Sequence, residues 1–312
     1  MNKEHIFTFL KGFAMGAANV IPGVSGGTIA FITGIYERLI NALKSMGPTA
    51  IKLLFKRDIK AFAAHIDLYF LISLGLGVIC SVFTLAKVLK VANTSHPVWV
   101  SAFFFGLILA SIFSVGRMVK NWAPRQVLAL VIGLSLAVTL VLVDQAQQNR
   151  DPMYLAICGI AAMCSMIIPG ISGSFILLLM GNYELIMLES VNMLRLGEFG
   201  VALPILIPVG IGAVAGLIAL SHILSWLFKT YHDTAVALIT GFVAGSLAII
   251  WPWKEAGKIE RFNGKEKIVS WKHTLPDFST SHDLIAAAIV IAGIALIVVT
   301  EYLAAKGNKT TN

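Results

Sequence analysis

Six apolar runs, each long enough to cross a lipid bilayer, constrain this chain more than any other feature. They occupy residues 67–90, 98–116, 125–143, 201–229, 233–251 and 284–303. About 20 apolar residues span the hydrocarbon core as a helix, and a spanning segment must satisfy its backbone polar groups internally. Charged residues make up only 13% of the 312 residues, whereas soluble domains carry about 25%. The sequence therefore predicts an all-α polytopic membrane protein.

A stretch of 20 residues occurs twice, 147 positions apart. Residues 21–27 read IPGVSGG and lead to GIYE at 34–37, while residues 168–174 read IPGISGS and lead to GNYE at 181–184. Nine of the 20 positions from 21 to 40 are identical in the second copy. An opened backbone in a bilayer is tolerated only where protein or a water-filled cavity surrounds it. Paired interruptions in two halves of a chain are typical of a transporter's binding site.

The motif regions 4–46 and 153–189 are predicted to be re-entrant hairpins of two apolar half-helices, each about 13–19 residues long. A single kinked spanning helix is the alternative for each. With hairpins, the halves 1–147 and 148–312 each contain one hairpin and three spans. Because the first half crosses the membrane an odd number of times, the second half starts on the opposite side and has the inverted orientation. The expected architecture is two inverted repeats, each a re-entrant helical hairpin plus three transmembrane helices.

The distribution of Lys and Arg predicts the orientation. One side collects 13 of these residues, and the other has four in short segments and six in the loop 252–283. Under the positive-inside rule both termini are cytoplasmic. The extracytoplasmic loop 252–283 should contain a β-hairpin with its turn at Asn263-Gly264. The basic, apolar stretch 47–65 should be an amphipathic helix on the anionic cytoplasmic leaflet.

The repeated motif has the chemistry of an anion site. Pro22 and Gly23 end one half-helix, and the opening of the next exposes up to four unpaired N–H groups and about half a positive charge. Such an arrangement binds phosphate, and inversion would bring both tips to one ligand. The candidate phosphate-binding residues are Asn19, Gly23, Ser25, Gly26, Gly27, Thr28, Gly170, Ser172, Gly173 and Ser174. The alternative is that small residues only permit close helix crossing and that Asn19 is a cap.

Three charged residues in the motif regions, Glu37, Arg38 and Glu184, are either functional or interfacial. Glu37 and Glu184 occupy matching positions about 12 residues, or roughly 18 Å of helix, beyond the motif serines. They are candidates for gating or for coupling to H+ or Na+, or they are interfacial groups. Arg38 has no counterpart in the second copy, where Leu185 stands. It is a further candidate for holding a phosphate headgroup at the cytoplasmic mouth.

Other chemistry is disfavoured. The net charge of +8 lies in short loops between apolar runs, which indicates membrane topology and not nucleic-acid binding. The seven histidines show no metal-ligand spacing. No histidine lies near the Ser-Gly elements to act as a catalytic base. No metal, cofactor or catalytic residue is therefore expected.

The paired motifs, Asn19 to Thr28 and Ile168 to Ser174 with Gly-x-Tyr-Glu after each, resemble those of the bacterial polyprenyl-phosphate transporter family. The resemblance covers almost the whole chain. It implies a protein of the bacterial cytoplasmic membrane that moves undecaprenyl phosphate from the outer to the inner leaflet, with the headgroup on the motif residues. The alternatives are an ion-coupled transporter of a small anion, a membrane enzyme acting on lipid phosphates and a structural membrane protein. The sequence leaves the oligomeric state open.

Overall fold

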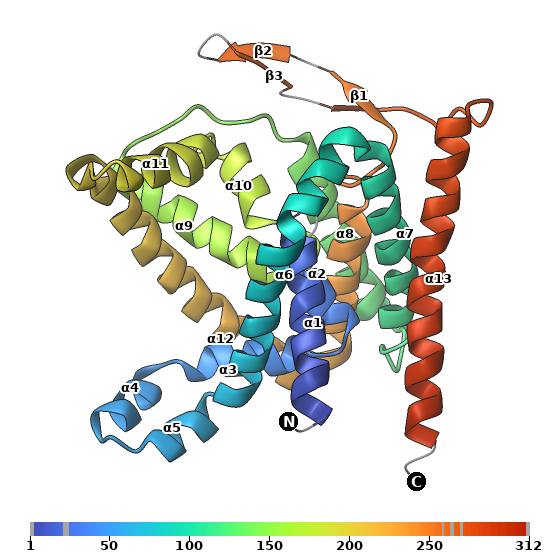
Figure 1. The fold of residues 1–312 in the computed structure, drawn as a ribbon. Helices are drawn as coiled ribbons and strands as arrows, with labels where there is room; N and C mark the ends of the chain where they lie inside the picture. The colour runs from blue at the N-terminus through green and yellow to red at the C-terminus, as the bar shows by residue number, and fades with distance from the viewer. Residues whose placement is uncertain (1–2, 21–24, 258, 263–264, 269–270, 310–312) are drawn as a thin grey trace.

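Long apolar helices dominate the computed structural model, which describes residues 3–20, 25–257, 259–262, 265–268 and 271–309 (Figure 1). Within these ranges five helices are long and apolar enough to cross a membrane. They are α6 (Leu68–Ser95), α7 (Pro97–Gly116), α8 (Pro124–Leu142), α12 (Phe199–Ser246) and α13 (Ser281–Lys309). The prediction of an all-α polytopic membrane protein is confirmed.

Helix α12 contains the two runs that the sequence separated at residues 230–232. It has 48 residues and is interrupted by non-helical dihedral angles at Tyr231, with φ −139° and ψ 51°. A straight helix of that length would measure about 70 Å, more than twice the roughly 30 Å of a bilayer core. Figure 1 shows its first part running beside α9 (Pro152–Ile167) and its second part turning back beside α8. The helix ends at Ser246 instead of at 251.

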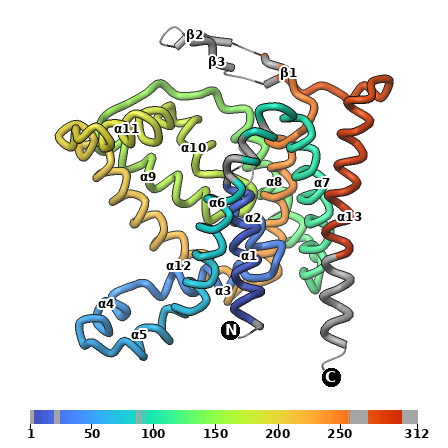
Figure 2. The backbone as a smooth tube through the Cα atoms, in the orientation of Figure 1, coloured from blue at the N-terminus to red at the C-terminus, as the bar shows by residue number. Residues whose placement is uncertain are grey.

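The two motif regions enter the bundle from opposite ends (Figure 2). The first comprises α1 (Lys3–Val20), α2 (Gly26–Ile32) and α3 (Tyr36–Ser45), and begins where both chain ends lie. The second comprises α9, α10 (Gly173–Leu179), the π-helix η1 (Glu184–Glu189) and α11 (Ser190–Arg195). The prediction of two long arms in each hairpin is wrong. Each second arm is a seven-residue helix, and each ends at a turn with a left-handed glycine, Gly34 (φ 71°) or Gly181 (φ 72°).

The helices pack mainly in four pairs: α1 with α6, α9 with the first part of α12, α7 with α13, and α8 with the second part of α12. If each helix is replaced by its counterpart in the other half of the chain, the pair α1–α6 becomes α9 with the first part of α12. In the same way, α7–α13 becomes the second part of α12 with α8. This is the pattern expected of an inverted repeat. The repeat itself stays a prediction.

Glycines mark the closest contacts in these pairs. A Cβ atom added to Gly77 would lie 2.1 Å from the Phe9 carbonyl oxygen, and one added to Gly212 would lie 1.9 Å from that of Ala156. The neighbouring Gly210 does not take part, since no described residue lies within 4 Å of its added Cβ. Helical residues two apart point to different sides.

Two segments lie outside the bundle. Strands β2 (Ile259–Phe262) and β3 (Lys265–Ile268) pair antiparallel, which confirms the predicted hairpin, although its turn residues are outside the described ones. A second pair, β1 (Lys254–Ala256) with β4 (Trp271–His273), connects it to the bundle. The prediction of one helix over 47–65 is wrong, because α4 (Pro48–Phe55) and α5 (Ile59–His65) are separated by Arg57 in the left-handed region (φ 56°).

Candidate functional site

The two motif loops meet in the interior of the bundle. The backbone N–H of Gly170 donates a hydrogen bond to the hydroxyl oxygen of Thr28 at 2.7 Å, and Thr28 is fully buried. This bond joins residues 142 positions apart in the sequence. The left-handed φ of Gly170 (98°) directs its N–H toward the other loop without the steric cost that a side chain would add. The structure thus brings the first and second motifs into direct contact.

The first motif also rests on the end of α9. A Cβ atom added to Gly27 would lie 2.9 Å from the carbonyl oxygen of Ile167 and 3.0 Å from that of Met166. The hydroxyl of Tyr36, itself buried, donates to the same Ile167 carbonyl at 3.0 Å. A helix end leaves its last carbonyls without intrahelical partners. Here Tyr36 satisfies one of these carbonyls, that of Ile167. The first motif can lie this close to the end of α9 only because residue 27 is glycine.

The motif serines cap the short helices that follow them. Ser25 Oγ accepts from the N–H of Gly27 at 3.1 Å, and Ser172 Oγ accepts from that of Phe175 at 3.3 Å. In such a cap the serine oxygen is the acceptor, so its own O–H can donate to a further group. Ser25 is only 2% exposed, whereas Ser172 is half-buried and lies 3.2 Å from the exposed hydroxyl of Ser174. The second loop is therefore the more accessible one in this conformation.

The other motif candidates support this arrangement. The exposed Asn19 accepts a hydrogen bond from the N–H of Gly26 at 2.7 Å, which leaves its amide N–H groups as donors. Gly26 and Gly173 are both buried, against Asn19 and Met166 respectively. Gly23, the remaining candidate, lies outside the described residues.

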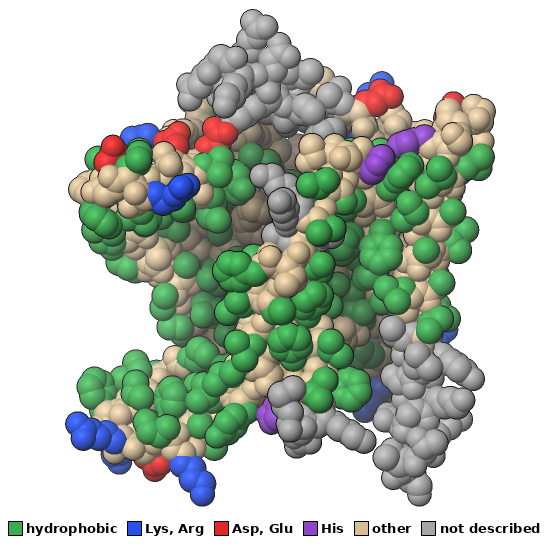
Figure 3. All heavy atoms as spheres, in the orientation of Figure 1, with side chains coloured by type: hydrophobic (Ala, Val, Ile, Leu, Met, Phe, Trp, Pro, Cys, Tyr) green, Lys and Arg blue, Asp and Glu red, His purple; other side chains and the backbone are tan. Residues whose placement is uncertain are grey.

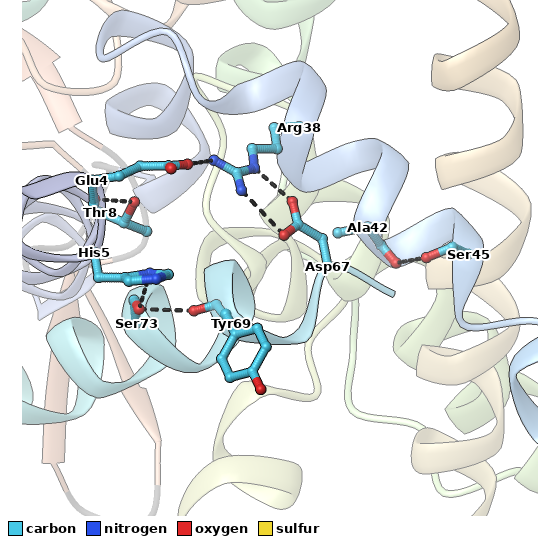
Figure 4. Close-up of polar contacts among 9 residues, drawn as sticks. All are labelled: Glu4, His5, Thr8, Arg38, Ala42, Ser45, Asp67, Tyr69 and Ser73. Carbon is cyan, nitrogen blue, oxygen red and sulfur yellow. Dashed lines mark hydrogen bonds and ion pairs between the residues drawn. The ribbon is translucent and has the colours of Figure 1, made fainter. Parts of the chain in front are cut away.

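Arg38 does not lie with the motif loops. Its guanidinium donates to both oxygens of Asp67, at 2.5 and 3.1 Å, and to Glu4 Oε1 at 2.6 Å (Figure 4). It also lies 4.4 Å above the ring of Phe70. Two carboxylates thus neutralise Arg38, which was predicted to bind the anionic headgroup. The Arg38 side chain instead connects α1, α3 and the start of α6. A phosphate headgroup would have to displace a carboxylate to bind here.

Glu37 contacts a residue that sequence analysis did not select. His232 places Nε2 3.1 Å from Glu37 Oε1 and Nδ1 3.3 Å from Asp233 Oδ1. Asp233 in turn accepts from the backbone N–H groups of Lys120 and Asn121. A neutral imidazole has one N–H, so only the protonated ring can donate to both carboxylates at once. His232 directly follows the break at Tyr231, and that position was the only sequence signal for it.

The two motif glutamates are not equivalent in the structure. Glu37 lies in the first turn of an α-helix, whereas Glu184 starts the π-helix η1, and both are half-buried. Both follow a left-handed glycine turn, so neither lies at the end of a straight helix from the motif serine as the sequence predicted. Within the described residues, no group of three or more acidic, His or Cys side chains could hold a metal ion.

The bond between the loops gives a first prediction. We expect Thr28→Val to leave the buried N–H of Gly170 without a partner and to destabilise the protein by about 1–3 kcal/mol. Thr33→Val is the matched control, because the hydroxyl of Thr33 donates to the carbonyls of Ile29 and Ala30 in the preceding helix and, among the described residues, not to the other motif. Thermal unfolding in detergent compares the two variants. Equal melting temperatures would show that the contact between loops contributes nothing to stability.

Comparisons with known proteins bear on this site. A family model described as undecaprenyl phosphate translocase-like matches residues 15–267, which includes both motifs. A polyprenyl-phosphate transporter of Vibrio cholerae is 37% identical over 310 residues, covering 97% of this chain and 98% of its own. A polyprenyl-phosphate transporter of Staphylococcus aureus is 31% identical over 256 residues, covering 78% of this chain and 85% of its own. No solved structure matches the chain.

Proposed function

Because the chain belongs to the undecaprenyl phosphate translocase-like family, we propose that it returns polyprenyl phosphate from the outer to the inner leaflet of the bacterial cytoplasmic membrane. The observation that carries this proposal is the contact of Thr28 with Gly170, which places both motif loops at one point inside the bundle. The opposite entry of the two hairpins supports an inverted repeat, in which such a point can be reached from either face.

The proposed headgroup site supplies donors for a phosphate. Ser25, Ser172 and Ser174 each have a hydroxyl, and Asn19 has an amide N–H. A phosphate moved through hydrocarbon without partners would cost many kcal/mol, so donors inside the bundle lower that barrier. The polyprenyl tail needs no cavity, since it can remain in the lipid while the headgroup crosses.

Transport by the purified protein tests this function. Proteoliposomes should move polyprenyl phosphate between leaflets, measured as the fraction accessible to a phosphatase added outside. Uptake of inorganic phosphate or sulfate without lipid movement would support a small-anion transporter instead. Release of free phosphate by the protein alone would support an enzyme acting on lipid phosphates.

The proposed orientation gives a topology prediction. The N-terminus and α4 lie at one end of the molecule, and the β-strands lie at the other (Figure 1). Single cysteines in place of Lys3 and Lys52 should therefore be labelled from the cytoplasm, and those in place of Asn149 and Glu198 from outside. If positions 3 and 52 are labelled from opposite sides, the first motif region spans the membrane and the inverted repeat fails.

Ion coupling gives a further prediction. Moving a negative headgroup into a negative-inside cell is opposed by about 2.3 kcal/mol per charge per 100 mV, and a co-moving H+ or Na+ would offset this. We propose that Glu37, with His232, and Glu184 bind the coupling ion. Glu37→Gln or Glu184→Gln should abolish the dependence of transport on pH or Na+ and leave headgroup binding largely intact.

The control for this prediction is Glu189→Gln, because Glu189 forms a peripheral ion pair with Arg150 at 3.3 Å. His232→Gln tests the part played by the imidazole, since glutamine, unlike histidine, cannot take up a proton. An unchanged ion dependence in both motif glutamate variants would place the coupling group elsewhere, for example at His222, which is exposed on α12.

A further inference from the structure

Residues 48–65, which we call the paddle, project from the helix bundle. Within the paddle α4 packs on α5, and α5 packs on the start of α6. Figure 1 shows the two helices extending sideways at the end of the molecule where both termini lie. The paddle is separate from the motif loops and has no part in the site described above.

The local sequence explains its shape. Pro48 starts α4, and Arg57 in the left-handed region ends it. The carboxylate of Asp58 then caps α5 by accepting from the N–H of Ala61 at 3.0 Å. In α4, Ile51 and Phe55 are four residues apart and share one face, and Lys52 and the C-cap residue Lys56 are offset from them by one position. Apolar and basic rows therefore run side by side.

Both rows are exposed. Phe55 is 84% exposed, and Ile51, Leu54 and Ile59 are each more than half exposed. Lys52, Lys56, Arg57 and Lys60 are exposed as well, and with Asp58 they give the paddle a net charge of +3, four cations less one carboxylate. Figure 3 shows the hydrophobic side chains of this lobe on the side toward the rest of the bundle and the basic ones at its outer edge.

We propose that the paddle binds the anionic lipid surface of the leaflet at the end of the protein where both termini lie. Its apolar row would enter the boundary between headgroups and chains, while its cations contact lipid phosphates. Helices of this composition lie in membrane interfaces, and anionic headgroups attract basic segments next to spanning helices. A protein partner fits less well, because the cores of protein interfaces are depleted of lysine.

A depth measurement on the full chain tests the proposal. A cysteine at Ile51 carries an environment-sensitive dye, with Cys80, Cys158 and Cys164 replaced by Ala. The protein is reconstituted without polyprenyl phosphate in vesicles of phosphatidylcholine alone or with phosphatidylglycerol, each containing a lipid-attached quencher. Quenching should be stronger with phosphatidylglycerol and should fall toward the neutral-lipid level as salt shortens the screening length.

Charge reversal provides the matched comparison. Lys52→Glu/Lys56→Glu/Lys60→Glu should remove the effect of phosphatidylglycerol, whereas Lys120→Glu/Lys229→Glu, at exposed sites outside the paddle, should preserve it. Equal quenching in neutral and anionic vesicles would overturn the proposal. Cross-linking of residue 51 to a second copy of the protein would also overturn the proposal, because the dye would then be covered by protein and not by lipid. Because no transported lipid is present, failure here leaves the proposed translocation untouched, and failure of translocation leaves this result valid.

Discussion

Gly77→Ala is expected to destabilise the protein by about 1–3 kcal/mol or more, the usual cost of forcing atoms into a packed interior. The added Cβ would lie 2.1 Å from the carbonyl oxygen of Phe9 and 2.7 Å from the backbone nitrogen of Phe13. Both are backbone atoms, so relief requires α1 and α6 to separate along much of their length. Thermal unfolding in detergent, with circular dichroism as the signal, measures the loss.

The same helix provides the control. Gly75→Ala places a Cβ in open space, and exchanging glycine for alanine within a helix stabilises by up to about 1 kcal/mol. Gly212→Ala and Gly210→Ala should repeat this contrast in the second half, because Gly212 lies against Ala156 and Gly210 is open. If Gly75→Ala and Gly77→Ala have equal effects, the close approach of α1 and α6 does not limit stability.

Ser25→Ala and Ser172→Ala are each expected to weaken binding of polyprenyl phosphate about tenfold or more. Removing a hydrogen bond to a charged group costs about 1.5–3 kcal/mol, and about 1.4 kcal/mol is a factor of ten. The double variant should depart from additivity, since both hydroxyls would serve one anion. Native mass spectrometry with added lipid gives the affinities. Strictly additive losses would indicate two independent sites.

Both serines are also helix caps. The loss of affinity that comes from a missing ligand contact must therefore be distinguished from a loss that comes from a weakened cap. Glycine is a much better cap than alanine and costs only a few tenths of a kcal/mol. Ser25→Gly and Ser172→Gly should therefore lose as much affinity as the alanine variants. If the glycine variants bind normally, the hydroxyls act on the loop and not on the ligand.

The spans could be predicted because a bilayer imposes length and composition on each one. The helices beginning at Pro97 and Pro124 start within one residue of the predicted 98 and 125, since proline is favoured in the first turn of a helix. The break at Tyr231 lies in the predicted gap. The shape of the hairpins was missed because Gly34 and Gly181 turn the chain inside apolar sequence.

The site could be predicted only in part. Glycines and hydroxyls indicated the loops, but no pattern within one copy of the motif indicates that Thr28 bonds to Gly170. Arg38 was predicted to hold the phosphate headgroup because nothing near it in the sequence indicates its carboxylate partners. These partners, Glu4 and Asp67, lie 34 and 29 positions away. His232 was missed for the same reason, as Glu37 is 195 positions from it. Long-range pairs of polar residues leave no local signal.

The exchange of helix partners has a consequence for biogenesis. Helices α7 and α8 are made early, yet α7 packs on α13 and α8 packs on the second part of α12, which are made last. Helices in a bilayer insert first and associate afterwards. Helices α7 and α8 can therefore pack on these partners only when synthesis is nearly complete. A chain that stops at residue 147 would contain all of the first half but would lack α13 and the second part of α12, the main packing partners of α7 and α8. Of the three long helices of the first half, only α6 therefore has its main packing partner in that half, and the bundle is completed only when the second half has been made.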